Sequence, residues 1–338
     1  SWSRQRGIIP VREFEIDRAN PTSGQVRYFW NVGRPLVSSG SVFLPLHKVA
    51  GFGVGWFTRS EGAFVRSDDL LTAADPSQAA WETLPVGEAG LRAPAGGGPI
   101  AEEQCLEELS DGTFFCVYRS IDGHPVTSYS RDRGRTWQAP VYAQYRDGRP
   151  LKHPRAACFV WKLRDGGYVL WFHNHGGRAF ADDPGRREAG YLGRNPAWMA
   201  RGVEIETLRG RELRWEDPEI VLYDDDPGIR LSYPDLKEEG AQLHLTETQK
   251  SVARVHVLPE RLARVLRQGA AGCDVSALGA MRLRVDPGNP VLPALPELVR
   301  RSPRLPNATE NTRAGLAIEL MLRPRTAGTV LLLAEHGR

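Results

Sequence analysis

The sequence has no apolar run that approaches the roughly 20 residues needed to cross a bilayer, and no charged-then-apolar leader stands at its start. We therefore expect a soluble chain without a membrane partner. A large excess of charge of one sign is also lacking, because the formal net charge is only +3. With no zinc-finger, basic-helix or RNA-binding pattern beside it, this charge argues against nucleic acid as a partner.

Cysteine and lysine are scarce. The four cysteines include no CxxC pair and lie mostly within apolar strand patterns, which favours buried thiols. A disulfide between Cys105 and Cys116 stays open, because the two residues flank one hairpin. Only five of the 44 basic residues are Lys, so Arg dominates. Arg suits bidentate binding of carboxylate or sulfate, although a GC-rich genome gives the same excess.

Alternating apolar residues bounded by Gly, Asp and Pro dominate residues 25–258, where amphipathic helix periodicity is almost absent. The clearest hairpin joins strands 105–109 and 113–119 through an Asp-Gly turn, which favours tight primed geometry. The strand-turn-strand pattern recurs within 157–173 and 232–248. Short strands at long, irregular spacing predict an all-β fold made of blades with insertions.

An Asp-box, with the sequence SRDRGRTW, occupies residues 130–137 directly after a predicted strand. We expect Asp132 to accept backbone and hydroxyl hydrogen bonds inside the turn, and Gly134 to supply a positive φ. Trp137 is expected to pack between strands of neighbouring blades. The motif thus indicates β-propeller architecture, and we assign it no catalysis.

Six further stretches of histidine, arginine, aromatic and acidic residues lie at 152–156, 172–177, 194–198, 232–235, 246–250 and 253–256. With the Asp-box they resemble the sialidase superfamily over residues 99–258, and more narrowly the propellers that attack rhamnose–uronate bonds, namely ulvan lyases and a rhamnosyl-glucuronate α-L-rhamnosidase. The resemblance implies a sialidase-like β-propeller, with six or seven blades in the intact protein, that is secreted or periplasmic. True sialidases carry an Arg-Ile-Pro element, a three-arginine carboxylate clamp and a Tyr/Glu pair. No Arg-Ile-Pro occurs here, which favours uronate-bearing sugars over sialic acid.

The domain organisation follows from changes in pattern. Residues 1–284 are predicted to form the propeller, with a short amphipathic helix at 260–268. The start at Ser1 suggests a processed leader or a truncated reading frame. Residues 285–312 are Pro-rich and polar, as in a linker. Residues 313–338 resemble the first strands of an incomplete laminin-G or concanavalin-like jelly roll, and the alternative is a strand pair that closes the propeller.

Three histidines are placed where blade loops converge, since His153 precedes a predicted strand while His173 and His175 end one. Histidine titrates near neutrality and can transfer a proton, although a hydrogen-bonded structural histidine is the alternative. In the lyases that the chain resembles, a His or Tyr abstracts the proton beside the uronate carboxylate, which implies catalytic roles for His153 and His173. His173 and His175 at i and i+2 of a strand could also chelate Zn²⁺ or Ca²⁺.

Charged and aromatic residues complete the predicted site. An arginine beside the base would neutralise the substrate carboxylate, and Tyr233 could protonate the leaving oxygen. A hydrolase would use carboxylates instead, for which Glu247 is favoured over Asp235, Glu102 and Glu103, with a salt bridge as the alternative reading of Glu247. The predicted catalytic residues are His153, His173, Tyr233 and Glu247. The predicted substrate-binding residues are Arg119, Arg155, Asn174, His175, Arg194 and Arg254.

The sequence therefore predicts a carbohydrate-active enzyme, an exo-acting glycoside hydrolase on acidic, uronate-bearing glycans. The alternatives are a polysaccharide lyase that cleaves rhamnose–uronate linkages by β-elimination and a non-catalytic carbohydrate-binding propeller. No P-loop, dinucleotide-binding fingerprint or Ser/His/Asp elbow occurs, so no nucleotide cofactor and no acyl transfer are expected.

Overall fold

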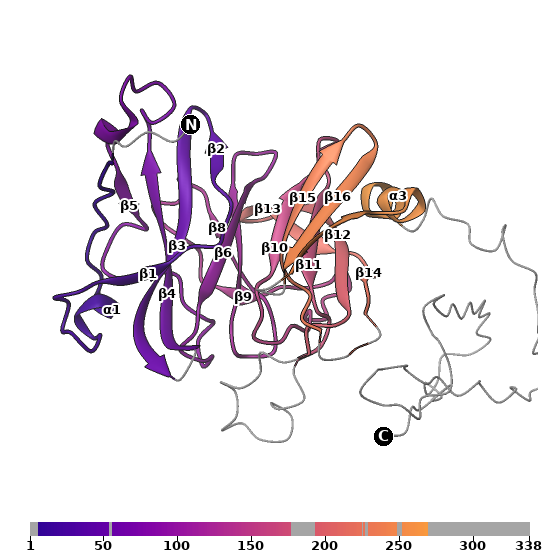
Figure 1. Cartoon of the computed structure of the whole chain (residues 1–338), viewed down its shortest axis with the longest axis horizontal. Helices are drawn as coiled ribbons and strands as arrows, with labels where there is room; N and C mark the ends of the chain where they lie inside the picture. Colours follow the sequence, from indigo (N-terminus) through magenta and orange to yellow (C-terminus); the bar gives the residue numbers. More distant parts are fainter. Residues whose placement is uncertain are drawn as a thin grey trace, which may run out of the picture. The chain divides into compact units, whose positions relative to one another are not determined.

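The computed structural model contains four antiparallel sheets, each made of strands that follow one another along the chain (Figure 1). It describes residues 6–53, 56–176, 193–224, 226, 229–248 and 252–269. All four sheets belong to one compact unit, residues 1–223 with 228–273. The linker expected at 285–312 and the jelly-roll strands expected at 313–338 lie outside the described residues.

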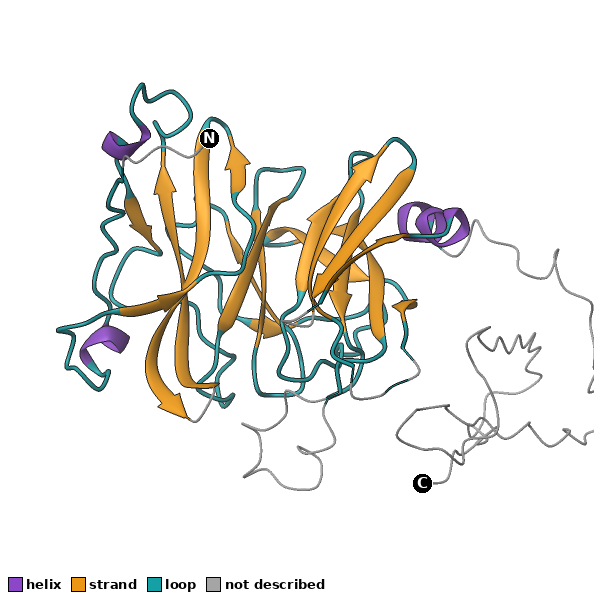
Figure 2. Cartoon of the chain, viewed as in Figure 1, coloured by secondary structure: helices purple, strands orange, loops and turns teal. Residues whose placement is uncertain are grey.

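Helix is a minor component of the described residues (Figure 2). A single turn, α1 (Glu15–Arg18), stands near the start, and a 3₁₀ turn spans Pro76–Gln78. The amphipathic helix predicted at 260–268 is confirmed as α3 (Glu260–Gln268), whose Ala263 and Leu266 are buried. The all-β prediction is likewise confirmed.

The first sheet follows the order β1-β3-β4-β5, and β2 also pairs with β3. Because β1 and β2 pair with opposite ends of the long β3, they act as one interrupted edge strand. Its strands are β1 (Tyr28–Trp30), β2 (Leu36–Ser38), β3 (Ser41–Gly53), β4 (Trp56–Ser67) and β5 (Glu82–Leu84).

The second sheet contains the predicted hairpin and follows the order β6-β7-β8-β9. The turn between β6 and β7 has Gly112 at φ 83°, but Asp111 has no positive φ, so the turn is not of the primed type that the Asp-Gly sequence favours. Its strands are β6 (Glu102–Glu108), β7 (Phe114–Arg119), β8 (Val126–Ser130) and β9 (Val141–Tyr142).

The third and fourth sheets contain the two recurrences of the hairpin pattern. In the third, β13 and β14 pair with different parts of β12, so they form one interrupted outer strand. Its strands are β10 (Phe159–Lys162), β11 (Tyr168–Phe172), β12 (Ala197–Thr207), β13 (Gly210–Trp215) and β14 (Glu219–Leu222). The fourth sheet contains β15 (Ser232–Glu239), β16 (Gln242–Thr248) and β17 (Ala253–Val257).

Successive sheets pack face to face through apolar side chains. The ring of Phe43 meets that of Phe114 edge-on across the first and second sheets at 4.9 Å between centroids. A larger core joins the second, third and fourth sheets, and in it Trp161, Trp171 and Trp215 are buried. Such consecutive meanders are the blades of a β-propeller. The described residues form four blades, and the six or seven expected of the intact protein stay a prediction.

The turn at residues 130–137 has the predicted hydrogen bonds. Asp132 accepts from the Thr136 amide at 2.8 Å and from its hydroxyl at 2.6 Å. Gly134 has φ 84°. The indole of Trp137 stacks on Phe64 of the neighbouring blade, with 5.2 Å between centroids. The turn therefore joins two blades as well as closing its own strand pair.

The cysteines of the described residues are buried free thiols, namely Cys105, Cys116 and Cys158. Cys105 lies opposite Val117 and not opposite Cys116 in the strand register. The expectation of buried thiols is thus confirmed for these three, and the disulfide left open by the sequence is not formed.

Candidate functional site

The first strands of the second and fourth blades share an irregular backbone at their second residue. Pairing of β6 with β7 shifts register between Glu102 and Cys105, and pairing of β15 with β16 shifts between Ser232 and Asp235. Within these bulges Glu103 has φ 58° and Tyr233 has φ 48°. Left-handed backbone at non-glycine residues is uncommon and gathers at functional sites.

The two bulged residues meet across the blades. The hydroxyl of Tyr233 donates to Oε1 of Glu103 at 3.2 Å. The other oxygen of Glu103 accepts from Arg119, at the end of β7, at 2.8 Å. The same guanidinium pairs with Glu102 at 2.7 Å. Two adjacent glutamates are thus held by one arginine, and one of them also contacts the tyrosine.

The third blade adds two arginines to this network. Arg155 is fully buried and pairs with Glu102 at 3.2 Å. Arg194 donates to the Ser232 hydroxyl at 3.0 Å and to the Arg155 carbonyl oxygen at 3.3 Å. We call this set the Tyr233–Glu103 network; its members are Glu102, Glu103, Arg119, Arg155, Arg194 and Tyr233.

Burial and charge set the protonation of the network. Burial alone would raise the pKa of Glu102, but the guanidinium groups of Arg119 and Arg155 outweigh it and hold that pKa below its ordinary value. The pKa of Tyr233 is raised, chiefly by the nearby Glu103 carboxylate and then by burial. Within the network three guanidinium groups face two carboxylates, a formal excess of one positive charge.

His153 and His173, the predicted proton-transfer pair, lie beside this network. Their rings stack at 5.7 Å with an interplanar angle of 4°. Nε2 of His153 donates to the Ala156 carbonyl oxygen at 2.7 Å, and its Nδ1 accepts from the His173 amide at 3.2 Å. Burial lowers the pKa of His153 to about 3 and that of His173 well below its ordinary value. Because both nitrogens of His153 are occupied by backbone groups, this arrangement favours the structural alternative for His153.

His175 and Asn174 do not have the strand geometry on which the chelation argument depended. Strand β11 ends at Phe172, and Asn174 has φ 48°, so His173 and His175 do not alternate as strand residues. His175 contacts the Gly193 carbonyl oxygen, and Asn174 accepts from the Tyr145 hydroxyl at 3.2 Å. Within the described residues, no three His, Cys, Asp or Glu side chains gather in a way that could hold a metal ion.

Glu247 and Arg254 form a pair of their own in the fourth blade. They face each other in the register of β16 and β17, and the guanidinium bonds the buried carboxylate. His256 lies 3.5 Å from the same oxygen. Among the described residues, Glu247 contacts Arg254 and His256, and it makes no hydrogen bond or ion pair with the Tyr233–Glu103 network. The salt bridge proposed as the alternative reading of Glu247 is therefore present.

Of the ten predicted residues, the structure brings four into one network and places two histidines beside it. Sequence reasoning gave Glu103 no preference over the other candidate carboxylates. It also did not single out His47, whose Nδ1 accepts a hydrogen bond from the Glu103 amide. One available signal was the pair of adjacent glutamates that directly follows the apolar residues Ile100 and Ala101, because carboxylates that become buried need partners.

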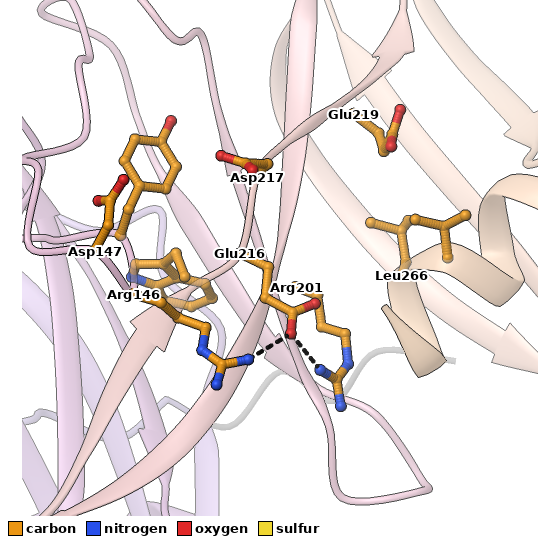
Figure 3. A pocket seen from close by; sticks show the side chains of 10 residues that line it. Arg146, Asp147, Arg201, Glu216, Asp217, Glu219 and Leu266 are labelled. Atoms are coloured by element: carbon orange, nitrogen blue, oxygen red, sulfur yellow. Dashed lines mark hydrogen bonds and ion pairs between the residues drawn. The ribbon is translucent and has the colours of Figure 1, made fainter. Parts of the chain in front are cut away.

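A separate cavity of about 320 Å³ lies between the β9–β10 loop, the β13–β14 connection and α3 (Figure 3). Arg146 and Arg201 both reach Glu216 there, at 3.3 Å and 3.0 Å. The cavity shares no residue with the Tyr233–Glu103 network, and its central charges are already paired.

No family model matches the chain, and no curated protein matches it. Solved structures similar to it include an intramolecular trans-sialidase from Ruminococcus gnavus, with 18% identity, a TM-score of 0.41, and coverage of 65% of this chain and 40% of that one. A leech intramolecular trans-sialidase has 17% identity and a TM-score of 0.42, and the match covers 65% of this chain and 28% of that one. The NanB sialidase of Streptococcus pneumoniae has 18% identity and a TM-score of 0.44, and the match covers 73% of this chain and 31% of that one. The chain thus spans less than half the length of each.

The fold is a β-propeller. Four consecutive blades, with the hydrogen-bonded turn of residues 130–137 between the third and fourth strands of one of them, agree with the fold predicted from the sequence. Among the described helices, none has the length and apolar character needed to span a membrane.

Proposed function

We propose that the protein is a glycoside hydrolase that acts on glycans ending in a carboxylated sugar, with Tyr233 as nucleophile and Glu103 as its base. The observation that carries this proposal is the 3.2 Å hydrogen bond from the Tyr233 hydroxyl to Glu103 inside a three-arginine network. A tyrosine nucleophile is the established variant of the two-carboxylate mechanism in sialidase-type enzymes.

The chemistry follows from this contact. A phenol is a weak nucleophile while protonated, and the raised pKa of Tyr233 keeps it protonated at neutral pH. Glu103 is within reach to take that proton as the phenol oxygen attacks the anomeric carbon, the glycosidic bond breaks and the leaving oxygen is protonated from solvent. Water then attacks the same carbon and breaks its bond to Tyr233, the proton of that water passes to solvent, and Tyr233 regains its own proton from Glu103. The charges of Arg119 and Arg194 oppose the rise in the Tyr233 pKa, so they favour the developing phenolate.

The arginines also suggest the substrate class. The network has a formal excess of one positive charge, and a substrate carboxylate would balance it. Arg119 and Arg194 are each about 8% exposed, whereas Arg155 is fully buried. We therefore assign carboxylate binding to Arg119 and Arg194, and a supporting role to Arg155.

The test is a comparison of variants on uronate-ended oligosaccharides, sialosides and neutral glycosides, with reducing sugar as the readout. We expect turnover of a carboxylated substrate and none of its neutral counterpart. Tyr233→Phe and Glu103→Gln should each lower kcat about 100-fold or more. Tyr28→Phe is the matched control, because Tyr28 lies in the first blade and its ring packs on Phe52 of the same blade. Full activity in Tyr233→Phe would sink the proposal.

A lyase remains the second candidate, because Tyr233 beside Arg119 and Arg194 also suits proton abstraction next to a carboxylate whose charge is neutralised. Elimination leaves an unsaturated uronate that absorbs ultraviolet light, whereas the products of hydrolysis have no such double bond and no such absorbance. Reducing ends without this absorbance support the hydrolase, and both together support the lyase. Measured glycan binding without either product would indicate the carbohydrate-binding alternative.

A further inference from the structure

The backbone amide of Glu103 does not take part in the β6–β7 strand pairing of its own blade. Strands β6 and β7 pair at Glu102 with Arg119 and resume at Cys105 with Val117, so the register shifts across Glu103. The freed N–H donates to Nδ1 of His47 at 3.2 Å. A left-handed backbone at a residue with a side chain persists only where its surroundings fix it. His47 is one such fixing contact, and it comes from another blade.

His47 is built into β3 of the first blade, opposite Trp30 on β1 and Gly62 on β4. It is 1% exposed, and its ring lies edge-on to Phe57 at 5.8 Å. Because Nδ1 accepts a hydrogen bond, the ring proton resides on Nε2. Nε2 has no hydrogen-bond partner among the described residues. Among the described residues, this buried side chain thus makes one hydrogen bond, and its partner is the Glu103 amide.

The neighbouring charges agree with a neutral acceptor. Burial lowers the pKa of His47, and Arg119 acts in the same direction, while the carboxylates of Glu102 and Glu103 act against them. The outcome is a lowered pKa, so the ring is neutral at physiological pH and its Nδ1 lone pair is available to the amide.

We propose that His47 is a positioning residue for the Tyr233–Glu103 pair, and that its hydrogen bond to the Glu103 amide holds the carboxylate where it meets both Tyr233 and Arg119. The inference rests on the proposed function. The two oxygens of Glu103 have different partners, Tyr233 at 3.2 Å and Arg119 at 2.8 Å, so rotation of the Glu103 backbone would break both contacts. His47 itself touches no reacting atom.

Two substitutions separate this role from simple packing. His47→Asn places an amide oxygen near the position of Nδ1 and retains the acceptor, whereas His47→Gln places its polar atoms nearer to Nε2. Both remove the ring and differ by one methylene. We expect His47→Gln to lower kcat about 10- to 100-fold with KM within about twofold, because misplacement of a reacting group affects kcat while the carboxylate-binding arginines remain. His47→Asn should restore most of kcat.

A second readout does not depend on activity. Glu103 is the first cause of the raised pKa of Tyr233, so displacing it should lower that pKa. NMR of chains labelled at the tyrosine Cζ, with Tyr233 assigned through Tyr233→Phe, would follow the titration. We expect a fall of about one unit or more in His47→Gln and little change in His47→Asn. Thermal melts of both variants check that each is folded.

The outcomes separate the two proposals. If no carboxylated glycan is turned over but the Tyr233 titration shifts as expected, the proposed function fails and the role of His47 stands. If the wild type is active and His47→Gln changes neither kcat nor the titration, the role of His47 is overturned. Should His47→Gln not fold, nitrogen NMR of the wild type decides, because a proton found on Nδ1 of His47 would also overturn it.

Discussion

Burial decides which residues around the site can exchange protons. His153 and His173 are 1% exposed and have strongly lowered pKa values, so they stay neutral at physiological pH and support the loops. Tyr233 is only partly buried, and its hydroxyl faces a carboxylate that can accept the proton. At this scale the proposed chemistry belongs to Tyr233 and Glu103, and burial favours a structural role for the histidines.

The lowered pKa of His153 predicts acid sensitivity. The unfolded chain takes up a proton on this side chain below about pH 6.5, whereas the folded chain does so only near pH 3. The stabilisation is therefore fully present above pH 6.5 and is lost as the pH falls through that window. We expect the free energy of unfolding to fall less steeply between pH 6.5 and 4 in His153→Asn than in the wild type. Denaturant titrations at several pH values measure both slopes, and equal slopes would contradict the prediction.

Individual strands and turns are fixed by local sequence. The Asp-Gly hairpin and helix α3 were predicted from a few neighbouring residues, because turn chemistry and amphipathic periodicity act over that range. The bulge at Glu103 was not predicted. Nothing in the residues around it distinguishes a regular strand from one whose amide is bonded to another blade.

The turn at residues 130–137 offers a test at this scale. Asp132→Ala removes the acceptor for the Thr136 amide and hydroxyl, and we expect a loss of about 1–3 kcal/mol in the free energy of unfolding. Because the turn lies outside the Tyr233–Glu103 network, kcat of the folded variant should match the wild type. Asp147→Ala is the control, because it removes only exposed bonds to Arg149 within one loop and should change stability by about 1 kcal/mol or less. An equal loss in both variants would show that the turn contributes no special stability.

Across the whole molecule, the open face of the first blade is covered by the segment that precedes it. Phe14 and Ile16 are buried against Leu46 and Val65 of that sheet. Asp17 and Lys48 form an ion pair with almost no exposure, and the ammonium lies 4.7 Å from the centre of the Phe14 ring. The covering segment is thus held by a buried charge pair as well as by apolar packing.

Breaking this pair should be costly, because it leaves one charge buried without its partner. We expect Asp17→Ala to lower the free energy of unfolding by about 3–5 kcal/mol. Replacing Lys48 by Met in the same chain should recover part of that loss. The control is Glu13→Ala, which removes an exposed ion pair with Arg18 and should cost about 1 kcal/mol or less. Chemical denaturation of the wild type and the three variants provides the comparison, and a cost for Asp17→Ala no larger than for Glu13→Ala would refute it.

The site as a whole was predictable only in part. Tyr233, Arg119, Arg155 and Arg194 stood out by residue type, but their convergence depends on how blades pack. Glu103 and Tyr233 are separated by 130 positions, and no local pattern links them. For the same reason Glu247 was favoured over Glu103, since a buried carboxylate in a strand has the same sequence pattern whether it pairs with Arg254 or faces a substrate.

The matching bulges of β6 and β15 have an evolutionary consequence. Glu103 and Tyr233 occupy the same place in two repeats, the second residue of a first strand with a positive φ. Each blade with this bulge offers one projecting side chain, and two of the four described blades have it. In such a scaffold a proton acceptor and a nucleophile can be acquired by exchanging single side chains, and new chemistry requires no rebuilding of the main chain.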